Sequence, residues 1–132
     1  MPARMRIAAA IAAVGCGTAR AAIHVVTANP DLTFTPAAIT IYQGDTIAFE
    51  NAGGVHNVHA DNNRFICSVN CTTNNAPSAA EWRANVQFNQ LGTFGYYCDA
   101  HGDLSGGMRG AVTVIDRIFV DGFDTAPAPR GE

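Results

Sequence analysis

The sequence predicts an all-β domain, a sandwich or a barrel. Short segments alternate apolar and polar residues with a period of two, and Gly, Asn and Asp residues punctuate the chain between them. No long segment repeats with the 3.6-residue period of an amphipathic helix. The chain has 132 residues, of which 48% are hydrophobic and 14% charged, so it is long enough and apolar enough for one compact domain.

Six segments carry the strand pattern. Alternation is clearest in "AITIY", where Ile39 and Ile41 share one face, and in "TIAFEN", where Ile47 and Phe49 do. Turn residues such as "QGD" separate the segments. The predicted strands span residues 23–28, 38–42, 46–51, 84–89, 94–98 and 110–115. The pattern is weakest over residues 62–81, where we expect a helical turn.

The chain divides into three parts: a signal peptide (1–21), a domain (22–116) and a C-terminal extension (117–132). Arg4 and Arg6 precede an apolar run over residues 7–14 that is too short to cross a bilayer as a helix. The following "TARA" places small residues at positions 19 and 21, as a cleavage site requires. We therefore expect export, to the periplasm or outside the cell, and no transmembrane span in the mature chain.

Two short segments leave alternatives open. Small residues precede Cys16, as at a lipid-attachment site, but Ala13 stands where such sites usually have leucine. The apolar and acidic "RIFVDGFD" (117–124) would cover a sheet edge or serve as a recognition peptide. The Pro-rich "TAPAPRGE" after it has the composition of a disordered tail.

The balance of charge bounds the partners. The chain has a formal net charge of −3 and no lysine, and removal of the signal peptide would make it more acidic. Nucleic acid is excluded as a partner because its phosphates require a basic surface. Acidity favours partners with basic docking surfaces, and we expect a monomer.

Soft and imidazole side chains gather in "YYCDAHGDLSGGM" (96–108). Cys98 and His101 are spaced so that one turn presents sulfur and nitrogen to the same ion, and Met108 follows after a Gly-containing segment. His56 in "GGVHNVHAD" offers a second imidazole. Two histidines, one cysteine and a weak axial methionine are the ligands of blue-copper electron-transfer sites, which stabilise both oxidation states.

These motifs resemble the plastocyanin-like cupredoxins from about Ile23 to Asp116. "ITIYQGDTIAFEN" is similar to the family's strand–Gly-Asp–strand segment, "VHNV" to its first ligand loop, and "GTFGYYCDAHGDLSGGMRGAVTV" to its second loop and closing strand. The resemblance implies a Greek-key β-sandwich with one type 1 copper held by His56, Cys98, His101 and Met108. It also implies that Asn57 ties the two ligand loops together. Six residues separate His101 from Met108, where plastocyanins have four.

Other cysteines and histidines suggest rival sites. His59 competes with His56, but side chains three apart on a strand face opposite ways, so we expect His59 on the outer face. Cys67 and Cys71 predict a disulfide in an exported protein. Together with Cys98 and His101 they would instead form a zinc site. A dinuclear copper centre needs a histidine and a methionine just after Cys71, where the chain has "TTNN".

The function that these patterns favour is single-electron transfer between redox proteins. The alternative is a copper storage or delivery module without a redox role. Catalysis is not expected, because the chain lacks the His-x-His pairs of a trinuclear copper cluster and "GDLSGG" is not a nucleophile elbow. No residue is therefore assigned as catalytic.

Overall fold

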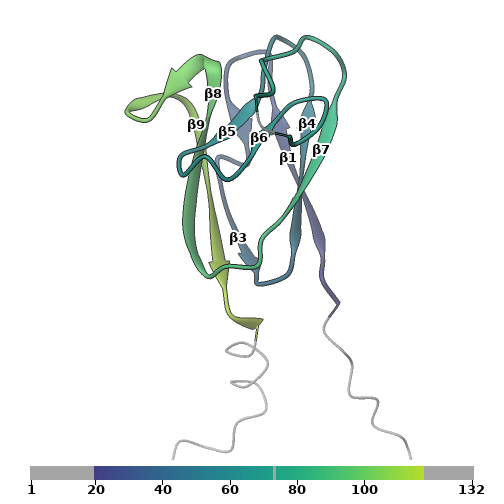
Figure 1. The fold of residues 1–132 in the computed structure, drawn as a ribbon, viewed down its shortest axis with the longest axis vertical. Coiled ribbons are helices and arrows are strands. Elements are labelled where there is room, and N and C mark those ends of the chain that lie inside the picture. Colours follow the sequence, from purple (N-terminus) through teal and green to yellow (C-terminus); the bar gives the residue numbers. More distant parts are fainter. Residues whose placement is uncertain (1–19, 73, 118–132) are drawn as a thin grey trace, which may run out of the picture.

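The protein folds as two facing β-sheets, in a computed structural model that describes residues 20–72 and 74–117. One sheet has the strand order β2-β1-β4-β7, and the other has the order β3-β9-β8-β5-β6 (Figure 1). The strands are β1 Ile23–Ala28, β2 Phe34–Thr35, β3 Ala38–Tyr42, β4 Thr46–Asn51, β5 Val58–Ala60, β6 Ile66–Cys67, β7 Arg83–Gln87, β8 Gly92–Asp103 and β9 Gly106–Ile115. The predicted all-β sandwich is confirmed.

Strand pairing brings distant parts of the chain to one end of the sandwich. β1 pairs in parallel with β4. β9, the last strand of the described residues, pairs in parallel with β3 and antiparallel with β8. β5 pairs with the other edge of β8, with His59 opposite Tyr97. The segment before β5 therefore lies beside the end of β8, at the opposite end of the sandwich from the point where β1 begins (Figure 1).

The core fills the space between the sheets, and Tyr96 is its largest fully buried side chain. Its ring makes edge-to-face contacts with Phe34 and Phe49, at centroid distances of 5.0 and 5.2 Å. Gly110 lies opposite Tyr96 on β9, and a Cβ there would come within 2.3 Å of the tyrosine ring. Only glycine therefore fits at this position. Other core residues are Val26, Ile41, Ile47, Val58, Trp82, Phe88, Val112 and Val114.

The segment 98–108 differs from its expected form. The sequence predicts that strands end at Cys98 and begin again at Gly110, but β8 continues to Asp103 and β9 begins at Gly106. Gly102 pairs with Gly107, and the register between the two strands shifts between Tyr97 and Gly102. The residues between His101 and Met108 therefore form the end of a β-hairpin. The helical turn expected within 62–81 is wrong, because the described part of that segment contains the short strand β6 instead.

A buried carboxylate closes the end of the sandwich where β1 begins. Asp45 is fully buried and accepts hydrogen bonds from the main-chain N–H groups of Ala22 and Tyr42. It also pairs with His24 at 2.9 Å and with Arg117 at 2.6 Å. Burial raises the pKa of Asp45, but these hydrogen bonds and the Arg117 charge outweigh it, so the pKa is lowered. His24 therefore has a structural role, as one of the partners of this buried carboxylate.

Several predictions fall outside the described residues. These are the signal peptide up to residue 19, the lipid-attachment alternative at Cys16, and the extension from residue 118 onward. Among the described residues, no helix is long and apolar enough to cross a membrane.

Candidate metal centre

The structure brings together three side chains that could hold one metal ion: those of His56, Cys98 and His101. Cys98 and His101 lie on β8, and His56 lies just before β5. The Cys98 Sγ atom is 3.8 Å from His56 Nδ1 and 3.7 Å from His101 Nδ1. All three donor atoms lie within 4.8 Å of one another.

The donor atoms fit a single soft metal ion. Metal–sulfur and metal–imidazole bonds are roughly 2.0–2.3 Å long. The observed sulfur–nitrogen separations are short enough for Cys98 and each histidine to hold the same ion. Thiolate with two imidazoles is a donor set for copper, and the structure keeps Cys98 as a free thiol for this purpose.

Burial separates the donors into an inner and an outer group. His56 and Cys98 are fully buried, and Met108 is 2% exposed in the same core cluster as Cys98. His101 is only half-buried. The two imidazole rings are 5.1 Å apart and inclined at 64°. A metal at this centre would therefore be shielded from solvent, with His101 as its most exposed ligand.

The main chain around His56 is fixed on both sides. His56 and Ser78 form an isolated β-bridge, with His56 N donating to Ser78 O at 3.2 Å and Ser78 N to His56 O at 2.9 Å. The buried Asn51 amide donates to the carbonyls of Gly54, Ser78 and Ala80. Gly54 has a φ of +89°, and a Cβ there would lie 2.7 Å from His56 Nε2. The ligand position thus depends on a glycine and on an asparagine that the sequence analysis missed.

Asn57 connects the two segments that carry the donors. Its amide nitrogen donates to the Asp99 carboxylate at 2.7 Å and to Asn75 O at 2.9 Å. Its amide oxygen accepts a hydrogen bond from Asp99 N at 2.9 Å. Asn57 follows His56 and Asp99 follows Cys98, so these bonds hold neighbours of two donors at fixed separation.

The electrostatics keep His56 in the form that binds metal. Burial lowers the pKa of His56, and the nearby His101 lowers it further. The main chain at Asn29 and Gly53 opposes this effect without reversing it. Imidazole coordinates a metal only when neutral, so a lowered pKa favours coordination.

The remaining sulfur and imidazole groups lie apart from this cluster. Cys67 and Cys71 are joined in a disulfide, as predicted. They therefore have no thiolates to offer, which rules out the zinc site built on Cys67, Cys71, Cys98 and His101. His59 pairs with Asp99 and stacks on Tyr97, at a ring distance of 4.7 Å, rather than joining the donors.

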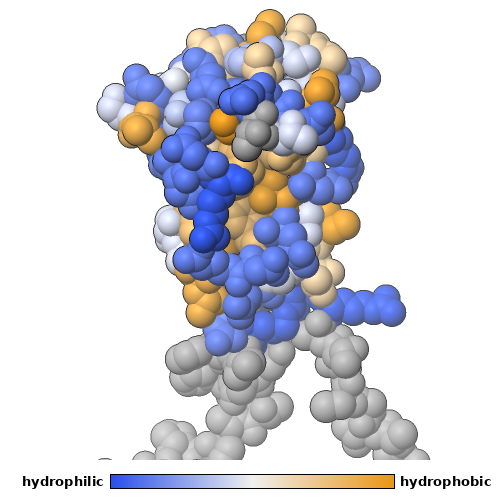
Figure 2. Space-filling view, viewed as in Figure 1, coloured by the Kyte–Doolittle hydropathy of each residue, from blue (hydrophilic) through white to orange (hydrophobic). Residues whose placement is uncertain are grey.

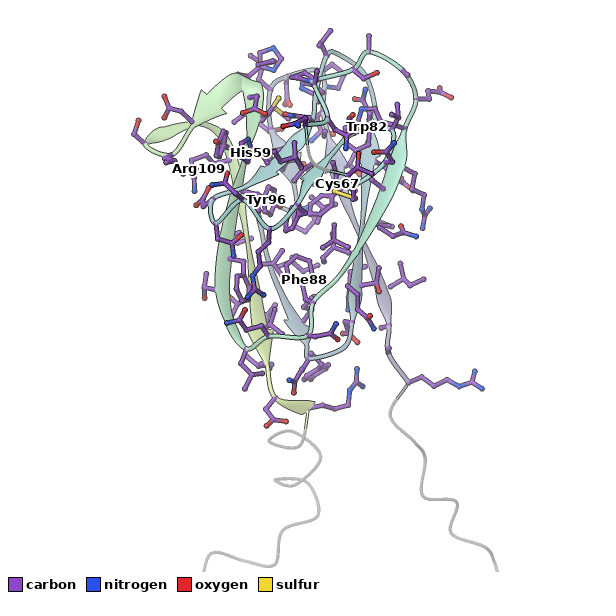
Figure 3. The ribbon with its side chains drawn as sticks, in the orientation of Figure 1. His59, Cys67, Trp82, Phe88, Tyr96 and Arg109 are labelled. Atoms are coloured by element: carbon purple, nitrogen blue, oxygen red, sulfur yellow. A yellow bond between two sulfur atoms is a disulfide. The ribbon has the colours of Figure 1, made fainter. Side chains whose placement is uncertain are left out.

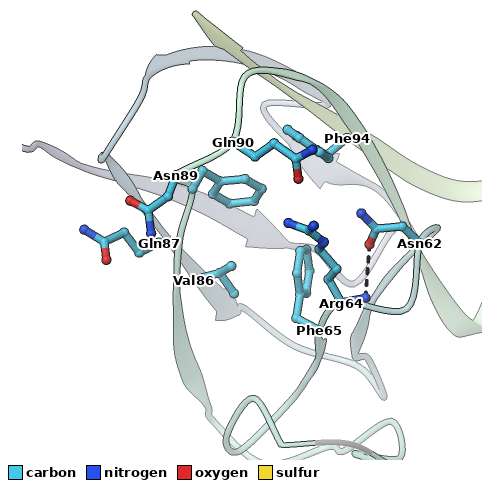
Figure 4. A pocket seen from close by; sticks show the side chains of 9 residues that line it. Asn62, Arg64, Phe65, Val86, Gln87, Asn89, Gln90 and Phe94 are labelled. Atoms are coloured by element: carbon cyan, nitrogen blue, oxygen red, sulfur yellow. Dashed lines mark hydrogen bonds between the residues drawn. The ribbon is translucent and has the colours of Figure 1, made fainter. Parts of the chain in front are cut away.

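A pocket of about 220 Å³ opens between the sheets, away from the donors. Figure 2 shows hydrophobic side chains exposed along the middle of this face. The pocket is lined by Phe65, Phe88 and Phe94 among amide side chains, and Asn62 accepts a hydrogen bond from Arg64 N (Figure 4). None of its lining residues is a histidine, a cysteine or a carboxylate, so it is no second metal centre.

A β-sandwich that buries a free thiol beside two imidazoles defines a copper protein of the cupredoxin class. Residues 21–115 match the family model for copper-binding proteins of the plastocyanin/azurin family. The chain belongs to this family, and copper is its cofactor.

Individual relatives agree with this assignment. Plastocyanin of Scenedesmus fuscus is 32% identical over 90 residues, which cover 63% of this chain and 87% of that protein. Chloroplastic plastocyanin of Silene latifolia subsp. alba is 33% identical over 117 residues, with coverages of 82% and 70%. Among solved structures, a reduced Cu(I) amicyanin variant has a TM-score of 0.52 at 25% identity, covering 70% of this chain and 82% of its own. A fern plastocyanin variant has a TM-score of 0.55 at 20% identity, with coverages of 69% and 99%, and shows the fold alone.

Proposed function

We propose that this protein is an exported type 1 copper protein that carries single electrons between redox partners. The observation that carries the proposal is the buried Cys98 thiol with one nitrogen of each histidine, His56 and His101, less than 4 Å away. Cys98 would bind as thiolate, the two histidines through Nδ1, and Met108 as the axial thioether. Bound copper supplies a centre that gains and loses one electron.

The protein's own contribution is to hold the donors still. His56 is fixed through Ser78 and Asn51, and Cys98 through the Asn57–Asp99 hydrogen bonds. A site that cannot relax toward the preferred geometry of either oxidation state needs little rearrangement when an electron moves. Rigid and buried donors favour a carrier over a storage module, which must release its metal to an acceptor.

Electrons would enter and leave at the end of the sandwich that carries His101, the one half-buried member of the cluster. Two exposed apolar side chains lie within three residues of a donor in the sequence, Val55 at 45% and Leu104 at 67% exposure. Val55 precedes His56, and Leu104 lies in the turn between β8 and β9. We place the docking surface for a redox protein here, with the acidic chain favouring partners of basic charge.

Export is supported by the predicted signal peptide and by the Cys67–Cys71 disulfide, since disulfides persist in oxidising compartments. The mature protein would then act in the periplasm or outside the cell. No group in the described residues is assigned to catalysis, and we propose no enzymatic activity.

The test is the visible spectrum and cyclic voltammetry of the protein after addition of Cu(II). We expect an intense blue colour from thiolate-to-copper charge transfer, together with a reversible one-electron wave. Cys98→Ala should abolish the colour, while Cys67→Ala combined with Cys71→Ala should retain it. A colourless wild-type protein with Cys98 reduced would contradict the proposal, and a blue protein without a reversible wave would favour storage.

A further inference from the structure

A row of three side chains crosses the outer face of the β3-β9-β8-β5-β6 sheet, beside the metal centre. His59 on β5 is the register partner of Tyr97 on β8, which in turn pairs with Arg109 on β9. The His59 ring stacks on Tyr97 at 4.7 Å and 22°, and the Arg109 guanidinium lies 5.8 Å from the same ring. Figure 3 labels His59 and Arg109 in this row. Only 16% of the His59 side chain is exposed, so its polar atoms depend on protein partners.

Both ring nitrogens of His59 face oxygen acceptors. Nδ1 lies 2.9 and 3.1 Å from the two carboxylate oxygens of Asp99, and Nε2 lies 2.7 Å from Asn63 Oδ1. A neutral imidazole has one donor and one acceptor nitrogen, whereas an imidazolium donates from both. Two facing acceptors therefore favour the protonated ring.

The charges around His59 act in the same direction. Burial by itself lowers the pKa of His59, but the hydrogen bonds to Asn63 and Asp99 and the charges of Asp99 and Asp61 outweigh it, so the pKa is raised above 6.5. Arg109 is the facing cation, and its guanidinium is bonded to both oxygens of Asp61.

The Asp99 carboxylate links this histidine to the donors. The Asp99 oxygen at 3.1 Å from His59 Nδ1 also accepts the 2.7 Å hydrogen bond from Asn57. Asn57 is fully buried and adjacent to His56, and Asp99 is adjacent to Cys98. A continuous path of hydrogen bonds thus runs from His59 through Asp99 to Asn57.

We propose that the His59 imidazolium is a positioning residue of the copper centre, which holds Asp99 against Asn57 and couples a proton on His59 to the reduction of the metal. The inference rests on the proposed electron-transfer function. The Cu(II) centre carries one more positive charge than the Cu(I) centre, so a charged His59 favours Cu(I). As pH rises above 6.5 and His59 loses its proton, the reduction potential falls.

The coupling can be measured in two ways, as a change in the reduction potential with pH and as a change in the pKa of His59 with the oxidation state of copper. We expect deprotonation of His59 to change the relative affinity for the two oxidation states about threefold. That corresponds to a fall of about 28 mV, at about 59 mV for each tenfold change. Because linkage is reciprocal, the pKa of His59 should be about half a unit higher in the Cu(I) form than in the Cu(II) form.

The chain offers a matched control. His24 pairs with Asp45 at 2.9 Å, the same distance as between His59 and Asp99, but on a strand end far from the donors (Figure 1). The reduction potential should be measured against pH for the wild type, His59→Gln and His24→Gln. We expect a fall of about 28 mV, converted as above, in the wild type and in His24→Gln, and none in His59→Gln. A wild type without the fall, or a His59→Gln variant that retains it, would overturn the proposal.

A second measurement does not depend on copper. The side-chain amide signal of Asn57 in the NMR spectrum of the metal-free protein should shift with pH, with the same midpoint as the His59 ring and above 6.5. In His59→Gln this shift should disappear. A His59 ring that titrates below 6.5, or an Asn57 signal that ignores its titration, would refute the positioning role even in a protein that turns blue. Absence of the blue colour in the wild type would instead count against the proposed function.

Discussion

Replacement of Asn57 by alanine tests whether its hydrogen bonds, which connect the segments that carry His56 and Cys98, stabilise the fold. The substitution removes three hydrogen bonds, of 2.7, 2.9 and 2.9 Å, from a side chain that is fully buried. Each such bond contributes about 1 kcal/mol, and the Asp99 carboxylate recovers part of its loss from water because 38% of its side chain is exposed. We expect the free energy of unfolding of the metal-free protein to fall by about 2–3 kcal/mol.

The assay is urea-induced unfolding of the metal-free protein, which separates the hydrogen bonds from the contribution of the metal. Asn89→Ala is the control, because Asn89 is an exposed amide and its loss should change stability by less than about 0.5 kcal/mol. If the free energy of unfolding falls no more in Asn57→Ala than in Asn89→Ala, the Asn57 hydrogen bonds do not hold the two segments together.

Three further substitutions probe the axial position, the core and the buried carboxylate. Met108→Leu should retain the blue colour and raise the reduction potential by about 59 mV or more in voltammetry. Loss of a donor destabilises Cu(II) more than Cu(I), which favours reduction. An unchanged potential would mean that Met108 is no ligand. Gly110→Ala should lower the free energy of urea-induced unfolding by about 2 kcal/mol, because its Cβ would clash with Tyr96. Gly106→Ala is the control and should be nearly neutral, because its Cβ would point into open space. Equal losses in the two variants would contradict the steric argument. Asp45→Ala should cost about 3 kcal/mol at neutral pH. Since the pKa of Asp45 is lowered from 3.8, the wild type should lose this advantage as pH falls below that value, and a gap unchanged by acid would contradict the ion-pair account.

The sequence predicted the strands whose faces alternate and missed those that lack this signal. Residues 23–28, 38–42 and 46–51 form strands with the predicted bounds, because Ile39, Ile41, Ile47 and Phe49 mark one face of each sheet. β2 has two residues and β5 has three, too few to show a period. The glycines before Met108 suggest a turn, but pairing with the neighbouring strand extends the hairpin through them, a tertiary effect that local composition does not record.

Some residues of the candidate site could likewise be predicted from the sequence, and others could not. Cys98 and His101 are close in sequence, so their spacing alone indicated a shared ion. The supports of His56 come from distant polar residues, Asn51 and Ser78, which have no spacing signature. Alternation separates His59 from His56, but it does not reveal that His59 would pair with Asp99, because that contact depends on the register between β5 and β8.

The position of the donors along the chain has a consequence for biosynthesis. Three of the four proposed ligands lie between residues 98 and 108, on β8 and at the start of β9. The strand β9 pairs in parallel with the early strand β3. Such contacts between the beginning and the end of a chain form late, because a long loop must close first. A polypeptide that is still being synthesised therefore has no complete binding site until nearly all of its domain is available. Only molecules with a completely folded domain would bind the metal, and binding would stabilise the pairing of β9.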